Sequence, residues 1–250
     1  RVLFRSYFDS VQANGLYGVA ARLALLFTVI PNAASAAVFP YFARRSTESK
    51  VPLVSGAAAL YRYLGVIGFG AAVFVALPAK GWLGLLFGNQ YPAAAAALAV
   101  LMASVPLSFL SAVNISILYS LERQQAVLKV MCAAIAADVV LDIVLIKMMG
   151  FTGAAYASLA TNLILFSSTV FLVKKEFGGA AFARGAVSAA CAAAVAGGAL
   201  FVLVRVLHVE QWVALAPAAA VFIAAAFVFR AVVKDDIVFV KEFISARRGA

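Results

Sequence analysis

The chain has 250 residues, of which 66% are hydrophobic and only 12% are charged, and its mean hydropathy is +1.04. Soluble domains carry about 25% charged residues, so this composition excludes a water-soluble globule. The sequence also lacks the short alternating segments that are typical of a transmembrane β-barrel. We therefore expect an all-α polytopic membrane protein with almost no room for a soluble catalytic domain.

About seven transmembrane helices are predicted, because seven apolar runs each reach the roughly 20 residues that cross a bilayer. The runs cover residues 16–42, 55–78, 91–119, 126–148, 151–173, 183–207 and 212–233. The connections between them are short, the longest lying at 79–90, so sequential helices are expected to be antiparallel neighbours. Residues 1–10, RVLFRSYFDS, read like the end of a further helix, which predicts that the chain is a fragment.

The formal net charge of +10 is explained by topology. Successive connections and chain ends alternate between the two sides of the membrane. One side holds thirteen basic residues and the other holds five. The thirteen are Arg44, Arg45, Lys50, Arg123, Lys129, Lys174, Lys175, Arg184, Arg230, Lys234, Lys241, Arg247 and Arg248. Basic residues collect on the cytoplasmic side, so the C-terminus is predicted to be cytoplasmic. Contact with anionic membrane lipids accounts for these charges better than nucleic acid, because no basic stretch is long or interleaved with aromatic residues.

The fourth apolar run contains two aspartates, Asp138 and Asp142, four residues apart and so on one helical face. A charge at the centre of a membrane helix costs from about 2.5 to more than 10 kcal/mol. Because like charges repel in a low dielectric, we expect at least one aspartate to exchange a proton near neutral pH. The pair indicates either an ion-coupling or substrate site, or an ion pair with Arg22 or Lys147 that joins helices.

Two arginines also lie in apolar runs. Arg22 lies about two turns into the first run, where its guanidinium could hold a phosphate bidentately or neutralise one of the aspartates. Arg62 lies towards the cytoplasmic end of the second run, between Tyr61 and Tyr63. It is a candidate for substrate contact, and snorkelling to the interface is the alternative.

Polar stripes run along the third and first apolar runs. They consist of Ser104, Ser108, Ser111 and Asn114, and of Thr28, Asn32 and Ser35. Such stripes either line a water-filled path or join helices through small and hydrogen-bonding side chains. Asn114 and Asn32 are the better candidates for a path. Pro31 and Pro106 lie in the same two runs and permit a bend, as transporters use near their binding sites.

Little in the sequence indicates an enzyme. The single histidine, His208, lies in a predicted outer connection, and no His, Cys or carboxylate cluster has metal-ligand spacing. The sequence has no phosphate-cradling P-loop. We therefore predict no catalytic residues, no metal and no cofactor.

Three strings resemble a known family. They are NGLYGVAARLALLFTVIPNAASAAVFPYFAR, LLFGNQYPAAAAALAVL and VVLDIVLIKMMGFTGAAYASLATNL, which together span about residues 11–175. In this order they resemble the oligosaccharide-lipid flippases of the multidrug/oligosaccharidyl-lipid/polysaccharide exporter superfamily. Asp138 and Asp142 depart from that pattern, which often has asparagine there, and Lys147 stands where it often has proline.

The resemblance implies two six-helix lobes around a central cavity, often with two added helices. Residues 1–175 would then be the second lobe, residues 176–250 an added helix pair with a cytoplasmic tail, and the N-terminal first lobe would be absent from this chain. The implied function is alternating-access movement of a polyprenyl-pyrophosphate-linked oligosaccharide across the bacterial cytoplasmic membrane.

In that reading Arg22 would bind phosphate, while Asn32, Asn114 and Arg62 would line the path. Asp138 or Asp142 would couple H+ or Na+. Two alternatives remain open: a cation-coupled multidrug exporter of the same superfamily, which the aspartates favour, and a membrane-embedded glycan polymerase. The short connections disfavour the polymerase.

Overall fold

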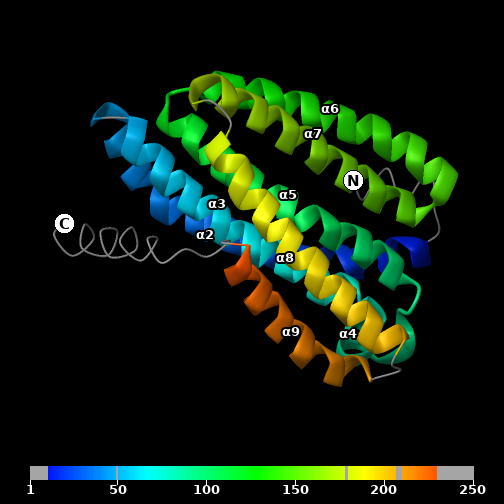
Figure 1. Cartoon of the computed structure of the whole chain (residues 1–250). Coiled ribbons are helices and arrows are strands. Elements are labelled where there is room, and N and C mark those ends of the chain that lie inside the picture. Colours follow the sequence, from blue (N-terminus) through cyan, green and yellow to red (C-terminus); the bar gives the residue numbers. More distant parts are fainter. Residues whose placement is uncertain (1–10, 49, 178–179, 207–209, 230–250) are drawn as a thin grey trace.

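The computed structural model describes residues 11–48, 50–177, 180–206 and 210–229, and in these segments the chain is helical with short connections (Figure 1). The elements are α2 (Val11–Glu48), α3 (Lys50–Ala76), α4 (Ala79–Phe87), η1 (Gly88–Gln90), α5 (Ala94–Ser120), α6 (Gln124–Met149), α7 (Phe151–Phe177), α8 (Ala180–Arg205) and α9 (Gln211–Val228). The predicted N-terminal helix end at 1–10, His208 and the tail at 230–250 lie outside the described residues.

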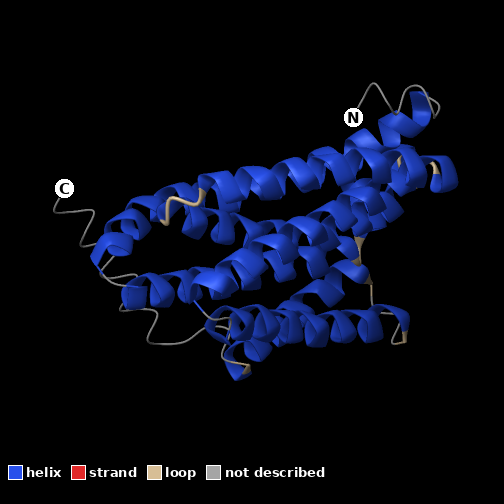
Figure 2. Ribbon diagram, turned by 90° about the horizontal axis from the view of Figure 1, so that it is seen from above, coloured by secondary structure: helices blue, strands red, loops and turns tan. Residues whose placement is uncertain are grey.

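Six of these helices are long and apolar enough to cross a membrane, so the chain is an all-α multi-pass membrane protein. The spanning segments are Gly15–Ala43, Val54–Ala76, Ala94–Ser120, Phe151–Phe177, Ala186–Val204 and Gln211–Val228. Figure 2 shows the same helices from above, stacked in layers with their long axes roughly aligned.

The fourth predicted span corresponds to α6, a helix of 26 residues that is not among the six. Its two aspartates are buried, whereas four of its large apolar side chains are more than half exposed. Those exposed side chains are Leu128, Ile135, Val140 and Met148. The helix therefore turns its two aspartates towards protein, while Lys129, Lys147 and the four apolar side chains lie on its exposed surface.

Helix α5 is the centre of the bundle, packed against α2, α3 and α7. Helix α6 packs on α7, while α8 packs on α3 and α9 on α8. Phe109, Met102 and Leu98 of α5 are fully buried in the core. At the α3–α5 crossing, a Cβ added to Gly68 would meet Pro106 Cα at 3.1 Å, so a small residue sets this close approach.

Residues 79–90, predicted as a connection between helices, are themselves helical and form α4 and the 3-10 turn η1. Pro78 precedes the first turn of α4, and the helix buries Ala79 and Leu83 four residues apart against the bundle. Apolar residues at this spacing favour a helix even over nine residues, once a neighbouring surface covers them.

Candidate functional site

Asp138 and Asp142 are the charged groups at the heart of the candidate site, and both face α7 from the middle of α6. Only 7% of Asp138 and 6% of Asp142 is exposed. The Thr161 hydroxyl of α7 donates a 2.9 Å hydrogen bond to Asp138 Oδ1. The structure thus brings the two predicted ion-coupling residues together on one buried face.

Hydroxyl groups extend this buried region across α7 to α2. A short turn at Gly150, which has φ of 60°, reverses the chain between α6 and α7. Asp138 then lies level with Thr161, and Leu145 lies against Gly153. Between these levels on α7, the Ser158 hydroxyl lies 3.3 Å from the Tyr17 hydroxyl of α2.

We call Asp138, Asp142, Ser158, Thr161 and Tyr17 the carboxylate layer. It combines two carboxylates with three hydroxyls, an oxygen-rich set that suits a proton or a hard cation. In the described part of the chain, no group of three or more His, Cys, Asp or Glu side chains could hold a metal ion.

Arg22 lies elsewhere, on the exposed side of α2. Within the described residues it forms no ion pair with Asp138 or Asp142, so that predicted pairing is not formed. Leu26 and Val29 are four and seven residues further along and share its face, with 67% and 64% of their surface exposed. The guanidinium therefore lies on an uncovered and otherwise apolar face.

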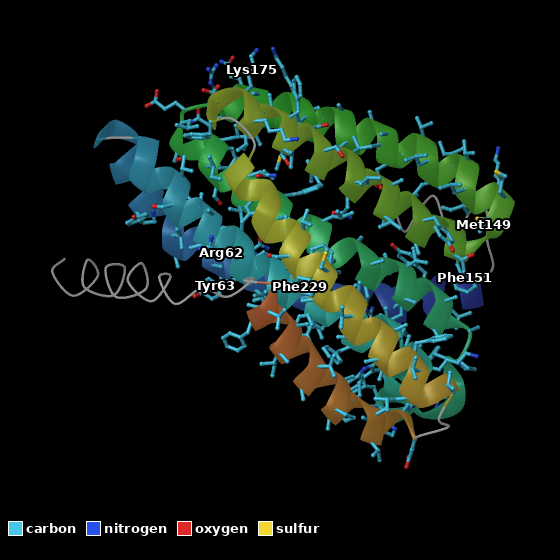
Figure 3. The ribbon with its side chains drawn as sticks, in the orientation of Figure 1. Arg62, Tyr63, Met149, Phe151, Lys175 and Phe229 are labelled. Carbon is cyan, nitrogen blue, oxygen red and sulfur yellow. The ribbon has the colours of Figure 1, made fainter. Side chains whose placement is uncertain are left out.

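The other candidates for substrate contact are divided between surface and interior. Asn32 is exposed on α2, and Arg62 is half-buried on α3, where Figure 3 labels it beside Tyr63. Arg62 is eight residues past Val54, the start of its span, so it lies about 12 Å inside that span.

Asn114 lies in the interior, where it joins three helices. The Tyr61 hydroxyl of α3 donates a 2.7 Å hydrogen bond to Asn114 Oδ1. Asn114 Nδ2 in turn donates a 3.1 Å hydrogen bond to the Thr169 hydroxyl of α7. Since only 1% of Asn114 is exposed, its amide joins helices in this conformation and does not reach a surface.

The serine hydroxyls of the same stripe form their hydrogen bonds within α5. The hydroxyls of Ser104, Ser108 and Ser111 each donate to a backbone carbonyl three or four residues earlier. Back-bonding of this kind is a standard way to place serine in an apolar helix. Of the four stripe residues, Asn114 is the one with interhelical hydrogen bonds.

Sequence reasoning overlooked the partners of these groups: Tyr17, Ser158 and Thr161 in the carboxylate layer, and Thr169 beside Asn114. A usable signal was the short turn at Gly150, which places Thr161, eleven residues after it, opposite Asp138, twelve residues before it. Comparison of the chain with protein-family models, with curated proteins and with solved structures finds no match.

Proposed function

We propose that this chain is the second lobe and added helix pair of a flippase that moves a polyprenyl-pyrophosphate-linked oligosaccharide across the bacterial cytoplasmic membrane by alternating access. The observation that carries the proposal is the position of Arg22. It lies seven residues past Gly15, about 10 Å inside a span, on a face where Leu25 and Leu26 are also exposed.

An arginine in this position needs an anion or water, because lipid tails solvate it poorly. A charge inside the bilayer costs about 2.5 kcal/mol or more unless it meets a cavity or a partner. Only 11% of the most apolar stretch of α2 is buried within this chain. An opposing first lobe would enclose this face as a cavity wall, and Arg22 would then present a bidentate donor to pyrophosphate.

The carboxylate layer supplies the coupling in this proposal. Binding of H+ or Na+ at Asp138 or Asp142 removes one negative charge from a buried interface between α6 and α7. That change alters the repulsion between two carboxylates one turn apart, and so biases how the two helices pack. Transport is a physical movement of substrate in this scheme, and the chain acts as a transporter with no catalytic step.

The same carboxylates favour one competing function, a cation-coupled multidrug exporter. Such an exporter would bind a cationic substrate at an acidic site and would have no use for a phosphate-binding arginine. The two functions therefore make opposite predictions for Arg22.

The test uses the complete transporter, with its first lobe, in proteoliposomes, following a labelled polyprenyl-pyrophosphate oligosaccharide with and without a proton or sodium gradient. Arg22→Ala should slow movement roughly tenfold or more, as expected for loss of a charge-assisted phosphate contact. Asp138→Asn or Asp142→Asn should abolish the response to the gradient.

Arg123→Ala is the matched control, because Arg123 lies at the end of the bundle in an exposed ion pair with Glu176. It should leave movement unchanged. Normal movement after replacement of Arg22, Asp138 and Asp142 would refute the proposal. Gradient-driven efflux of a cationic dye without lipid movement would assign the protein to the exporters.

A further inference from the structure

Helix α4 lies at the end of the bundle where α3 and α8 end and where α5 and α9 begin. It joins the end of α3 to the start of α5, and its Trp82 ring packs edge-on against Trp212 at the start of α9, with ring centroids 5.1 Å apart. Figure 1 shows α4 beside the ends of α8 and α9. Nine residues rise only about 13 Å, far less than a bilayer, so α4 lies at a membrane boundary.

The exposed surface of the second half of α4 is apolar. Leu85, Leu86 and Phe87 are 66%, 53% and 37% exposed, and they lie on a part of the helix that no described neighbour covers. The α5–α6 turn at the opposite end of the bundle is equally exposed, but its exposed residues are polar: Glu122, Arg123, Gln124 and Gln125. A turn in water exposes polar residues, as the α5–α6 turn does. The apolar residues exposed on α4 therefore indicate a surrounding other than water.

Aromatic side chains also lie at the end of the bundle where α4 is found. The Trp82 indole N–H donates a 2.9 Å hydrogen bond to the carbonyl of Phe74, which fixes the ring at the end of α3. Phe87 packs edge-on against Tyr91, with centroids 5.9 Å apart. Tryptophan and tyrosine are enriched at membrane–water interfaces, because their rings are apolar and their tips are polar.

An apolar groove opens beside the start of α4. It has a volume of about 180 Å³ and lies between the end of α3, the end of α8 and the start of α9. Its lining consists of Leu77, Pro78, Leu200, Phe201, Val204 and Gln211. Leu77 and Phe201 are also more than half exposed, so the groove continues the apolar outer surface of the spanning helices.

We propose that α4 and η1 form an interfacial segment that binds the phospholipids of the leaflet at this end of the bundle. Leu85, Leu86 and Phe87 insert among the acyl chains, and part of one acyl chain occupies the groove. The exposed Lys80, in the first turn of α4, lies at the level of the lipid phosphates. The occupant is lipid because both surfaces are continuous with the lipid-facing sides of α3 and α8. This inference is independent of the substrate transported.

Site-directed spin labelling tests the proposal on the full chain in vesicles of phosphatidylethanolamine and phosphatidylglycerol. The two native cysteines, Cys132 and Cys191, are first replaced by alanine. Labels at Leu85→Cys and Leu86→Cys should be reached by oxygen in preference to a water-soluble nickel complex. Their depth should be about 5–10 Å below the lipid phosphates, as for other interfacial helices.

Gln125→Cys is the matched control at the opposite, polar turn and should be reached by the nickel complex. Equal access of that complex to positions 85, 86 and 125 would overturn the proposal by placing α4 in water. Access of neither reagent to positions 85 and 86 would also overturn it, because protein would then cover α4.

A second readout avoids labelling α4. The chain has only two tryptophans, so Trp212→Phe leaves Trp82 as the sole tryptophan, which can be excited selectively. Phosphatidylcholine brominated near the headgroup end of its acyl chains should quench Trp82 more strongly than phosphatidylcholine brominated near the chain ends. Absence of quenching by either lipid would overturn the proposal.

Discussion

Helices α5 and α2 are both apolar along their spans, yet their surroundings are opposite. The most apolar stretches have hydropathies of 2.1 in α5 and 1.7 in α2, but 61% of the first and only 11% of the second is buried. Hydropathy therefore indicates that a helix belongs in a bilayer, and it does not tell whether its neighbours are lipid or protein. The same residue type has different consequences in the two helices.

The largest expected difference concerns leucine. Leu110 of α5 is 1% exposed, whereas Leu26 of α2 is 67% exposed. Leu110→Ala should lower the free energy of unfolding by about 2–5 kcal/mol, because it leaves a cavity in the core. Leu26→Ala should change it by less than about 0.5 kcal/mol. Reversible unfolding of this chain in mixed SDS micelles measures both, and equal losses would contradict the comparison.

The next largest difference in the free energy of unfolding is expected between replacements of two asparagines. Asn114→Ala removes the acceptor of the buried Tyr61 hydroxyl, so the free energy of unfolding should fall by about 1–3 kcal/mol. Asn32→Ala, on the exposed side of α2, serves as the control and should be near neutral. If Asn114→Ala is also neutral in the same unfolding assay, the amide does not join α3, α5 and α7 as described.

The smallest of these effects concerns the carboxylate layer. Thr161→Val removes the hydrogen bond to Asp138, and interhelical hydrogen bonds in membranes contribute about 0.6 kcal/mol on average, with a maximum near 1.7. Thr152→Val is the matched control, because the Thr152 hydroxyl bonds only to the Met149 carbonyl of the preceding turn. A double-mutant cycle with Asp138→Asn measures the coupling, and zero coupling would contradict the contact.

Much of the fold could be predicted because apolar runs report directly on membrane helices. The runs at 126–148 and 151–173 correspond closely to α6 and α7, which end and begin around Gly150. The run at 16–42 underestimates α2, which continues to Glu48, because a helix does not stop where its apolar residues stop. Pro31 and Pro106 lie inside α2 and α5, which continue past them as single helices.

The candidate site was only partly predictable. Spacing alone placed Asp138 and Asp142 on one face, and the structure shows that this face is buried against α7. Spacing could not distinguish Asn114 from Asn32, since both lie in apolar helices beside small polar residues. Their different exposure depends on which helix is central, and that is a property of the whole bundle.

The sequence by itself determined that this protein is a bundle of membrane helices, because composition and the length of apolar runs show which segments lie in the bilayer. It also determined that two carboxylates share one face, because helical periodicity is local. Only the tertiary structure decided that Thr161 bonds Asp138, that Asn114 is interior and that Arg22 lies on an uncovered face. Burial and hydrogen-bond partners depend on contacts between residues that are distant in the sequence, and these exist only once the helices pack.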